Sequence, residues 1–228
     1  MSQAADSGLI HTFFNADIVR QTSPMVMEAV GQTIAIGVLV IVAGILLGTA
    51  LATWRFHTQS RVLRALIVGY VDVLRAMPPL VILILVYFAL PYVNISIGSV
   101  LATFLCLSVI LSAFIEECVW SGIMTLPKGQ MEAARSTGMS WWQSMRHVIL
   151  PQALRLSLPQ ITNRCIAAIK NTALGSVIGF AEILGSAQAA SSDYANPTPL
   201  TLCAILYIGL IYPLVLASRY LEHRAGIR

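Results

Sequence analysis

Charge is what this sequence has least of. Asp, Glu, Lys and Arg together make up 11% of its 228 residues, whereas an average soluble domain carries about 25%. A soluble chain of this length needs more polar side chains to cover its surface, so an ordinary soluble enzyme is excluded. Disorder is excluded as well, because 57% of the residues are hydrophobic and disordered chains are poor in such residues. The mean hydropathy of +0.78 therefore indicates a protein of the lipid bilayer.

Several sequence patterns that carry chemistry are also missing. The four cysteines lack the paired spacing of metal ligands, so we expect small buried apolar residues and no metal site. The absence of a Gly-x-x-x-x-Gly-Lys-Ser/Thr phosphate loop argues against an ATPase. No basic patch interleaved with aromatic residues is present, which argues against nucleic-acid binding. The first 27 residues have no apolar run behind a basic start, so we expect no secretory signal.

Long uncharged stretches predict where the chain crosses the membrane. Residues 29–54 contain no Asp, Glu, Lys or Arg, and neither do residues 76–115. A bilayer core of about 30 Å needs about 20 helical residues. The first stretch therefore fits one span, and the second holds most of two, divided by a helix-breaking Pro-Tyr-Val-Asn sequence. The sequence predicts five spans, at about residues 31–53, 66–90, 97–121 and 200–218, with a weaker fourth span within residues 152–180.

The basic residues predict the orientation of these spans. Ten of the Lys and Arg residues fall in segments 55–64, 125–155 and 219–228, which share one side if there are five spans, and the opposite side has Arg20 alone. Because Lys and Arg are enriched in cytoplasmic loops, we expect the N-terminus outside and the C-terminus in the cytoplasm. We expect a single transmembrane domain over residues 1–228, with an N-terminal extension of about residues 1–27 and a cytoplasmic loop of about residues 125–151.

That cytoplasmic loop has the local pattern of two short helices joined by a tight turn. Pro127 suits a helix start, residues 130–137 are rich in helix formers, and Gly138 is placed to end the helix in a left-handed conformation. Ser140 and Gln143 form a possible capping box for the second helix. We therefore predict a helical elbow between two spans.

The elbow has features that a plain connection does not need. It is longer than most helix–helix connections, which run to about 8 residues. Trp141 and Trp142 lie beside small residues, which suits docking on another protein, and the same rings equally suit the lipid interface. Pro151 is expected to mark the next helix boundary.

The elbow resembles the EAA loop of ABC importer permeases, whose pattern is Glu-Ala-Ala, three residues, Gly, nine residues and Ile-x-Leu-Pro. Here Glu132-Ala133-Ala134 and Gly138 keep that spacing, and Val148 stands in place of the Ile. Flanking sequences resemble the polar amino acid (histidine–glutamate/glutamine) permeases, and the resemblance covers about residues 29–219. The chain departs from that family at Trp120, where an arginine is usual, and at Ala76-Met77, where Gly-Thr is usual.

This resemblance implies a fold and a function. The implied fold is an all-α integral membrane protein with five transmembrane helices, the type I ABC importer permease fold, with a cytoplasmic coupling helix. The chain would be the transmembrane subunit of an ATP-driven importer that moves a polar amino acid or amino-acid-derived (opine-type) solute across the bacterial cytoplasmic membrane by alternating access. Its implied partners are an ATP-binding subunit dimer, an identical or related permease subunit and an extracytoplasmic solute-binding protein. ATP and magnesium would bind the ATPase, so this chain is expected to be no enzyme and to carry no cofactor.

Residue roles in the elbow follow from the same resemblance. Glu132, Ala133, Ala134 and Gly138 are expected to couple the chain to the ATPase, with Gly138 acting as a turn residue more than as a contact. Glu132 has a simpler alternative, which is a local ion pair with Lys128 one helical turn away.

Charged residues inside predicted spans form a second group of candidates, because a charge at mid-membrane costs at least about 2.5–3.5 kcal/mol. Asp72 and Arg75 are spaced i, i+3, so we favour a local pair near the cytoplasmic interface over a substrate role. Glu117 matches a glutamate of the family, so we favour it over Glu116 for a structural or gating role. Glu182 also falls where the family has a glutamate.

The predicted fourth span is too polar to face lipid on every side. Asn163 and Lys170 share one helical face by their i, i+7 spacing, and Thr172 follows closely. We expect Asn163, Lys170 and Thr172 to line the translocation path, where a cation suits a carboxylate-bearing solute. The simpler alternative is that these polar side chains are structural, and either bond to backbone groups or extend toward the membrane surface (snorkelling).

Two other classes of protein compete with this interpretation. An autonomous channel or secondary transporter of small polar solutes would need no ATPase, but the EAA pattern and the absence of inverted repeats argue against it. An intramembrane enzyme would need catalytic residues within the spans, and all four histidines lie outside them, with no Gly-x-Ser-x-Gly or His-Glu-x-x-His motif.

Overall fold

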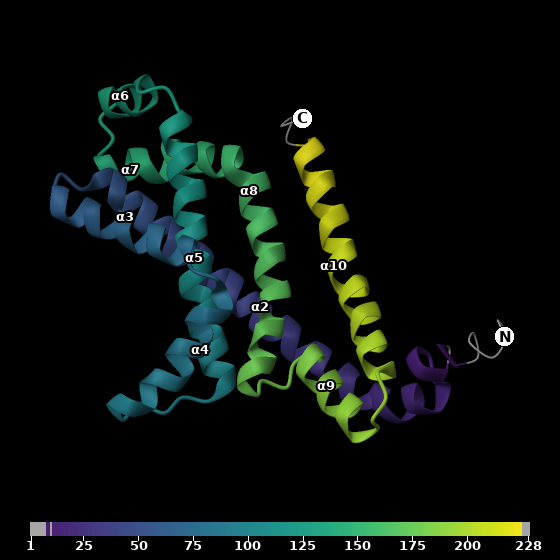
Figure 1. Cartoon of the computed structure of the whole chain (residues 1–228). Coiled ribbons are helices and arrows are strands. Elements are labelled where there is room, and N and C mark those ends of the chain that lie inside the picture. Colours follow the sequence, from purple (N-terminus) through teal and green to yellow (C-terminus); the bar gives the residue numbers. More distant parts are fainter. Residues whose placement is uncertain (1–7, 10, 225–228) are drawn as a thin grey trace. The chain divides into compact units, whose positions relative to one another are not determined.

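The computed structural model describes residues 8–9 and 11–224, with side chains described as far as Tyr220. Within these residues every regular element is a helix, as Figure 1 shows. The α-helices are α2 (Ala16–His57), α3 (Arg61–Ala76), α4 (Pro79–Ala89), α5 (Ser99–Thr125), α6 (Gly129–Ser136), α7 (Trp141–Ser144), α8 (Leu150–Asn171), α9 (Ile183–Asp193) and α10 (Thr198–Arg224). The 3-10 segments η1 (Leu90–Val93) and η3 (Thr172–Ile178) and the π-helical segment η2 (Met145–Ile149) complete the fold.

Among the described residues, three helices are long and apolar enough to cross a membrane, namely α2, α5 and α10. Two bent helix pairs also qualify if each pair is one span, and the count then reaches the predicted five. The second predicted span is broken because Met77 has an extended backbone (φ −92°, ψ 138°), the conformation favoured before a proline. The predicted fourth span tightens from α8 into η3 and stops at Gly179, whose φ is +83°.

The N-terminal part of the chain differs from the prediction, and some residues at both ends lie outside the described residues. Helix α2 has 42 residues and begins at Ala16, inside the predicted N-terminal extension. The rest of that extension includes residues 1–7 and 10, which lie outside the described residues, and so does Arg228 of the basic tail.

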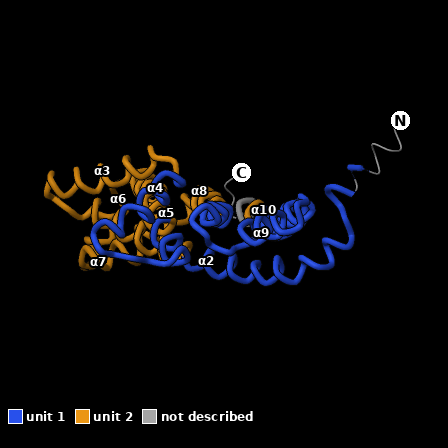
Figure 2. The backbone as a smooth tube through the Cα atoms, turned by 60° about the horizontal axis from the view of Figure 1, so that its bottom comes forward, with its two compact units in different colours: residues 1–39, 79–106, 168–215 blue, residues 40–78, 107–167, 216–228 orange. Residues whose placement is uncertain are grey.

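The described chain divides into two compact units, drawn in different colours in Figure 2. Unit 1 comprises residues 1–39, 79–106 and 168–215, and unit 2 comprises residues 40–78, 107–167 and 216–228. Helices α2, α5, α8 and α10 contribute residues to both units. The predicted single domain stays a prediction, and each unit is described by itself below.

Unit 1 is organised around two apolar clusters in which cysteines pack as small hydrophobic residues. The first cluster contains Val26, Ile183, Ala187 and Cys203, and the second contains Leu83, Ala102, Cys106 and Ile178. The buried Thr33 hydroxyl accepts a hydrogen bond from the Ile183 backbone N–H at 3.2 Å. These contacts fix the start of α9 against α2, and the buried cysteines agree with the packing role predicted for them.

Unit 2 depends on small residues that let α2 and α5 approach closely. Gly44, Gly48 and Ala52 recur every fourth residue on α2, which puts them on one helical face. A Cβ added at Gly48 would lie 2.5 Å from the Ser112 carbonyl oxygen, and one at Gly44 would lie 2.7 Å from the Leu111 side chain. Membrane helices pack through such small-residue faces because lipid supplies no hydrophobic force between them.

Candidate functional site

The predicted elbow is present in unit 2. Helix α6 covers the segment expected to be helical, within one residue at each end. Gly138 has φ +88°, so the left-handed turn predicted there is confirmed. No atom lies within 4 Å of a Cβ added at Gly138, which shows that the residue is needed for its backbone conformation and not for space.

The capping box predicted for the second helix is also confirmed. The Ser140 hydroxyl accepts a hydrogen bond from the Gln143 backbone N–H at 3.3 Å, and the Gln143 side-chain oxygen accepts one from the Ser140 N–H at 2.8 Å. These bonds satisfy two donors at the start of α7 that the helix itself leaves unpaired.

The boundary predicted at Pro151 is confirmed within one residue, as a change of helix type without a break in the helix, because η2 ends at Ile149 and α8 begins at Leu150. Helix α7 runs into the π-helical segment η2, and the Leu150 N–H bonds to the Met145 carbonyl where the two segments meet. A π-turn spaces donors and acceptors five residues apart, and α8 then restarts at Leu150 with Pro151 in its first turn, where its missing N–H is tolerated. The Gln152 side chain donates to the Val148 carbonyl at 2.7 Å.

The four predicted coupling residues lie together on or next to α6. Glu132 and Ala133 are exposed, whereas Ala134 is buried against the rest of the elbow. Glu132 makes no ion pair with Lys128 or with any other side chain that the structure describes. The local pair considered as an alternative is therefore absent, and the Glu132 carboxylate is free for another contact.

A hollow of about 360 Å³ adjoins the turn of the elbow and is lined by Thr137, Gly138, Met139, Gln143 and His147. The two tryptophans of α7 differ in exposure. Trp141 is half-buried, with ring centroids 6.3 Å from Phe56 and 4.2 Å from His57, whereas Trp142 is 59% exposed.

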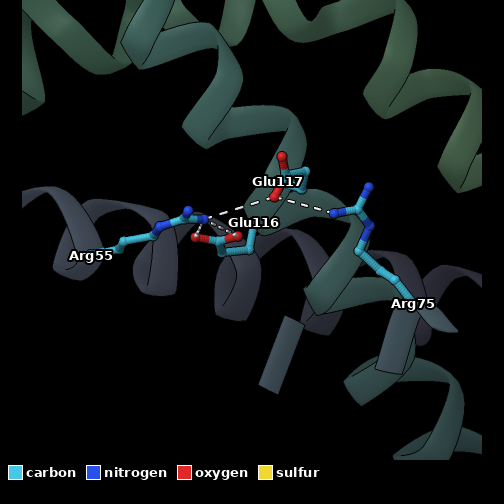
Figure 3. A network of polar contacts seen from close by, with 4 residues as sticks. All are labelled: Arg55, Arg75, Glu116 and Glu117. Atoms are coloured by element: carbon cyan, nitrogen blue, oxygen red, sulfur yellow. Dashed lines mark hydrogen bonds and ion pairs between the residues drawn. The ribbon is translucent and has the colours of Figure 1, made fainter. Parts of the chain in front are cut away.

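Close to the elbow, unit 2 holds a network of four charged side chains, shown in Figure 3. From α5, Glu116 is fully buried, and its two carboxylate oxygens accept from Arg55 Nη1 on α2 at 3.1 and 3.3 Å. Glu117 is 3.2 Å from Arg75 Nη1 on α3 and 3.8 Å from Arg55 Nη1. The network is electrically neutral, and it ties three helices together.

This network corrects one prediction and adds a residue to another. Arg75 pairs with Glu117 and not with Asp72, which is exposed and makes no ion pair within the described part of the chain. A partner on a packed neighbouring helix thus replaces the local i, i+3 pair. Glu116, which sequence comparison ranked below Glu117, is the more deeply buried carboxylate.

The tryptophan that departs from the family pattern belongs to the same network. The Arg55 guanidinium lies over the Trp120 ring, 4.0 Å from its centroid, a distance at which the ring quadrupole attracts a cation. Arg55 is thus held by a carboxylate on one side and by an aromatic ring on another.

The three residues predicted to line the path differ in their surroundings. Asn163 is exposed in unit 2. In unit 1, Lys170 lies on the lining of a hollow of about 540 Å³ formed by α8, η3, α9 and α10. Thr172 is fully buried, and its hydroxyl donates to the Ile169 carbonyl at 2.7 Å, which is the simpler role considered for it.

Glu182 in unit 1 has a defined structural role. Its side chain is fully buried and caps α9 by accepting from the Gly185 N–H at 2.8 Å. The Tyr207 hydroxyl of α10 donates to its other carboxylate oxygen at 2.6 Å. A carboxylate at a helix N-terminus is favoured by the helix dipole, so Glu182 fixes both the start of α9 and its contact with α10.

Sequence reasoning missed Arg55, Glu116 and Tyr207 as site residues. Arg55 and Glu116 are 61 positions apart, so only the packing of α2 on α5 reveals their pairing. Glu116 could have been found from the sequence, because a charge within a predicted span is costly and needs a partner. The sequence contains no comparable sign for Tyr207.

Comparison with known proteins shows which family has this sequence and fold. Residues 41–227 match the family model described as binding-protein-dependent transport system inner membrane component. The chain is 32% identical over 216 residues to the probable amino-acid ABC transporter permease protein YckA of Bacillus subtilis (strain 168), covering 92% of this chain and 95% of that protein. It is also 32% identical over 211 residues to the probable glutamine ABC transporter permease protein GlnM of the same organism, covering 92% and 97%.

Two solved structures share the fold. A crystal structure of an amino acid ABC transporter with histidines matches with a TM-score of 0.80 at 29% identity, covering 90% of this chain and 96% of that one. An inward-facing structure of the MetNI methionine ABC transporter matches with a TM-score of 0.74, covering 88% and 96%, and at 22% identity it supports the fold alone.

Proposed function

Because the chain belongs to the family of binding-protein-dependent transport system inner membrane components, we propose that it carries a polar amino acid or an amino-acid-derived solute through the membrane by alternating access. It is a multi-pass inner-membrane ABC permease, and ATP is bound and hydrolysed by separate subunits while the permease carries no cofactor. The proposed solute class rests on one observation, the 32% identity to amino-acid permeases along nearly the whole chain.

The elbow is the proposed contact with the ATPase. Helix α6 is short, and the left-handed turn at Gly138 and the capping box at Ser140 hold its C-terminal end. The free, exposed carboxylate of Glu132 is then available to a partner, while Ala134 packs inward. A rigid element of this kind passes movement of the ATPase subunits to the spans, which is how a partner biases a two-state membrane protein.

Reversing the charge of Glu132 tests this contact. We expect Glu132→Arg to abolish co-purification of the ATPase subunit while the permease still inserts and folds, because the residue is exposed and unpaired. The control is Asp193→Arg, which reverses an exposed acid at the C-terminal end of α9 and leaves the elbow intact.

Retention of the ATPase by the Glu132→Arg variant would contradict the proposed role of that residue. Gly138→Leu gives an independent check, because a leucine at φ +88° strains the turn by about 1–3 kcal/mol and displaces α6. Solute flux into vesicles that lack any ATPase would contradict the importer itself.

Lys170 is the proposed contact for the solute. It is the charged residue among the side chains that line the hollow of about 540 Å³ in unit 1, and an ammonium group there suits a carboxylate. Asn163 in unit 2 and Thr172 in unit 1 remain proposed path residues, although the backbone bond to Ile169 also accounts for the Thr172 hydroxyl. Asp72, Arg75 and Glu117 in unit 2 and Glu182 in unit 1 are proposed to hold or gate the helices of their own units.

Neutralising Lys170 separates transport from folding. We expect Lys170→Gln to lower solute uptake at least about tenfold, the loss of one charge-assisted hydrogen bond, while the complex with the ATPase still assembles. Lys170→Arg keeps the charge and should restore part of the uptake. Equal uptake by wild type and Lys170→Gln would remove this residue from the path.

A second permease subunit is the remaining proposed partner within the membrane, beside the ATPase and the solute-binding protein that the family implies. In the most apolar 18-residue stretch of α10, only 6% is buried, whereas 61% is buried in the corresponding stretch of α5. An identical or related permease would cover part of that face. Disulfide cross-linking through cysteines placed at exposed positions such as Ile208 would detect it as a permease dimer.

A further inference from the structure

Two adjoining hollows in unit 2 share Trp54 and His57 in their linings. The larger, which we call the acyl groove, has a volume of about 860 Å³ and runs between α2 and the segment from α7 into α8, with Ala50 on one wall and Leu154 on the other. The smaller, which we call the headgroup hollow, has a volume of about 420 Å³ and contains Arg135 of α6.

We propose that these two hollows bind one glycerophospholipid with an anionic headgroup. Its acyl chain lies in the acyl groove, and its phosphate lies against Arg135 in the headgroup hollow. The proposal requires only that unit 2 lies in a membrane, which the family establishes.

The dimensions of the acyl groove fit a lipid tail. Its lining residues on α2 extend from Ile45 to His57, and twelve helical rises of about 1.5 Å give about 18 Å. One leaflet is half of a hydrocarbon core of about 30 Å, so the groove has about the depth of a single leaflet. Aliphatic and aromatic side chains dominate its lining, with Leu46 at 67% exposure.

The headgroup hollow has the opposite chemistry. Arg135 is exposed and makes no ion pair within the described residues, and neither hollow has an Asp or Glu in its lining. The amide of Gln59 and the His57 ring add further polar groups. A guanidinium binds phosphate oxygens through paired hydrogen bonds, so the hollow favours an anion.

Tryptophans mark the junction between the two hollows. Trp54 is 55% exposed and Trp142 is 59% exposed, and the His57 ring lies 4.2 Å from Trp141 and 5.2 Å from Trp142 between centroids. Indole rings concentrate where the hydrocarbon core meets the headgroups. An apolar groove, an aromatic junction and a basic hollow thus follow one another in the order of a phospholipid from tail to headgroup.

The location gives the lipid a route to the transport cycle, and this consequence rests on the function proposed above. Arg135 lies on α6, three residues after Glu132. A lipid bound there contacts both the membrane-spanning α2 and the helix that meets the ATPase. Anionic lipid would then stabilise one position of α6.

Lipid retained by the purified transporter, with its ATPase subunits present, tests the site directly. The complex is incubated with micelles containing equal phosphatidylglycerol and phosphatidylcholine, and bound lipid is counted by mass spectrometry. One basic residue near an anionic leaflet is worth about fivefold in affinity, so wild type should prefer phosphatidylglycerol by about that factor. Arg135→Gln should lose the preference, whereas Arg61→Gln, a basic residue of the same side outside both hollows, should keep it.

The acyl groove has its own matched pair of variants. Ala50→Phe fills the groove and should reduce retention of both lipids, whereas Leu47→Phe enlarges an exposed residue outside its lining and should not. If Ala50→Phe fails to fold, Leu154→Trp closes the groove from the α8 side.

Two results would overturn the proposal. One is equal lipid preference in wild type and Arg135→Gln, and the other is equal retention by the Ala50→Phe and Leu47→Phe variants. If the first result is accompanied by loss of ATPase binding in Arg135→Gln, Arg135 belongs to the contact with the partner protein. Glu132 lies outside both hollows, so Glu132→Arg should leave the lipid preference unchanged, and the two proposals fail separately.

Discussion

At the scale of single residues, the charged network of unit 2 shows that charged side chains are tolerated inside a membrane protein when each has a partner of opposite charge. Glu116 is fully buried and holds Arg55 through two hydrogen bonds, and Arg55 also lies over Trp120. Glu117 is partly exposed and bridges to Arg75. A buried carboxylate is tolerated only when its partner is in place, because an unpaired charge loses its hydration without compensation.

Neutralising the two glutamates separately should therefore give unequal effects. We expect Glu116→Gln to destabilise the protein by about 3–5 kcal/mol, the cost of leaving one buried partner uncompensated. Glu117→Gln should cost about 0–1 kcal/mol, because its side chain is 38% exposed and its pair is partly solvated. Thermal unfolding midpoints in detergent provide the comparison.

The double variant Arg55→Met with Glu116→Met is the control for this pair. Replacing both partners by apolar residues should recover most of the loss, because no unpaired charge remains. Equal midpoints for Glu116→Gln and Glu117→Gln would mean that burial does not set the importance of these carboxylates.

At the scale of elements, the fold depends on how closely helices approach each other within each unit. The face of Gly44, Gly48 and Ala52 brings α2 against α5, and that contact is what places Arg55 beside Glu116. On α5, Gly122 makes a second close approach, because an added Cβ would lie 2.6 Å from the Ala153 carbonyl oxygen of α8. These contacts determine where the elbow between α5 and α8 is held.

Adding one methyl group at Gly48 tests the α2–α5 contact. We expect Gly48→Ala to destabilise the protein by about 1–3 kcal/mol, the usual cost of overpacking, because the new Cβ would lie 2.5 Å from a backbone oxygen. Gly69→Ala on α3 is the matched control. Its Cβ meets no atom within 4 Å, and an alanine in a helix gains about 0.5–1 kcal/mol over glycine.

Unfolding midpoints distinguish the two alanine variants, and reduced ATPase binding by Gly48→Ala would further link this contact to the position of the elbow. The interpretation would be wrong if Gly48→Ala were as stable as Gly69→Ala.

At the scale of the whole molecule, the chain is a membrane subunit whose energy source lies in other subunits. The helices supply up to five spans, and the long connection between α5 and α8 supplies the elbow that is proposed to contact the ATPase. The distribution of basic residues predicts the orientation of these spans. That orientation determines which loops face the cytoplasm, where ATP is bound by separate subunits.

Labelling with a membrane-impermeant maleimide on intact cells tests the orientation. We expect Ser96→Cys, in the connection between η1 and α5, to be labelled from outside, and Gln59→Cys, between α2 and α3, to be protected until the cells are broken. Both positions are exposed, whereas three of the four native cysteines are buried. If only Gln59→Cys were labelled in intact cells, the predicted orientation would be wrong and the opposite one would hold.

The amino-acid sequence by itself determined the features that depend on neighbouring residues. Uncharged stretches marked the spans, because hydrocarbon excludes charge along any helix that crosses it. Gly138 and the Ser140–Gln143 pair marked the elbow, because turn and cap chemistry is confined to a few consecutive residues.

Only the tertiary structure decided which helical faces meet. It paired Arg55 with Glu116 and Tyr207 with Glu182, and it joined α7 to α8 through a π-helical segment. The sequence contains no record of these pairings, because periodicity shows that a helix has a packing face but not which other helix that face contacts.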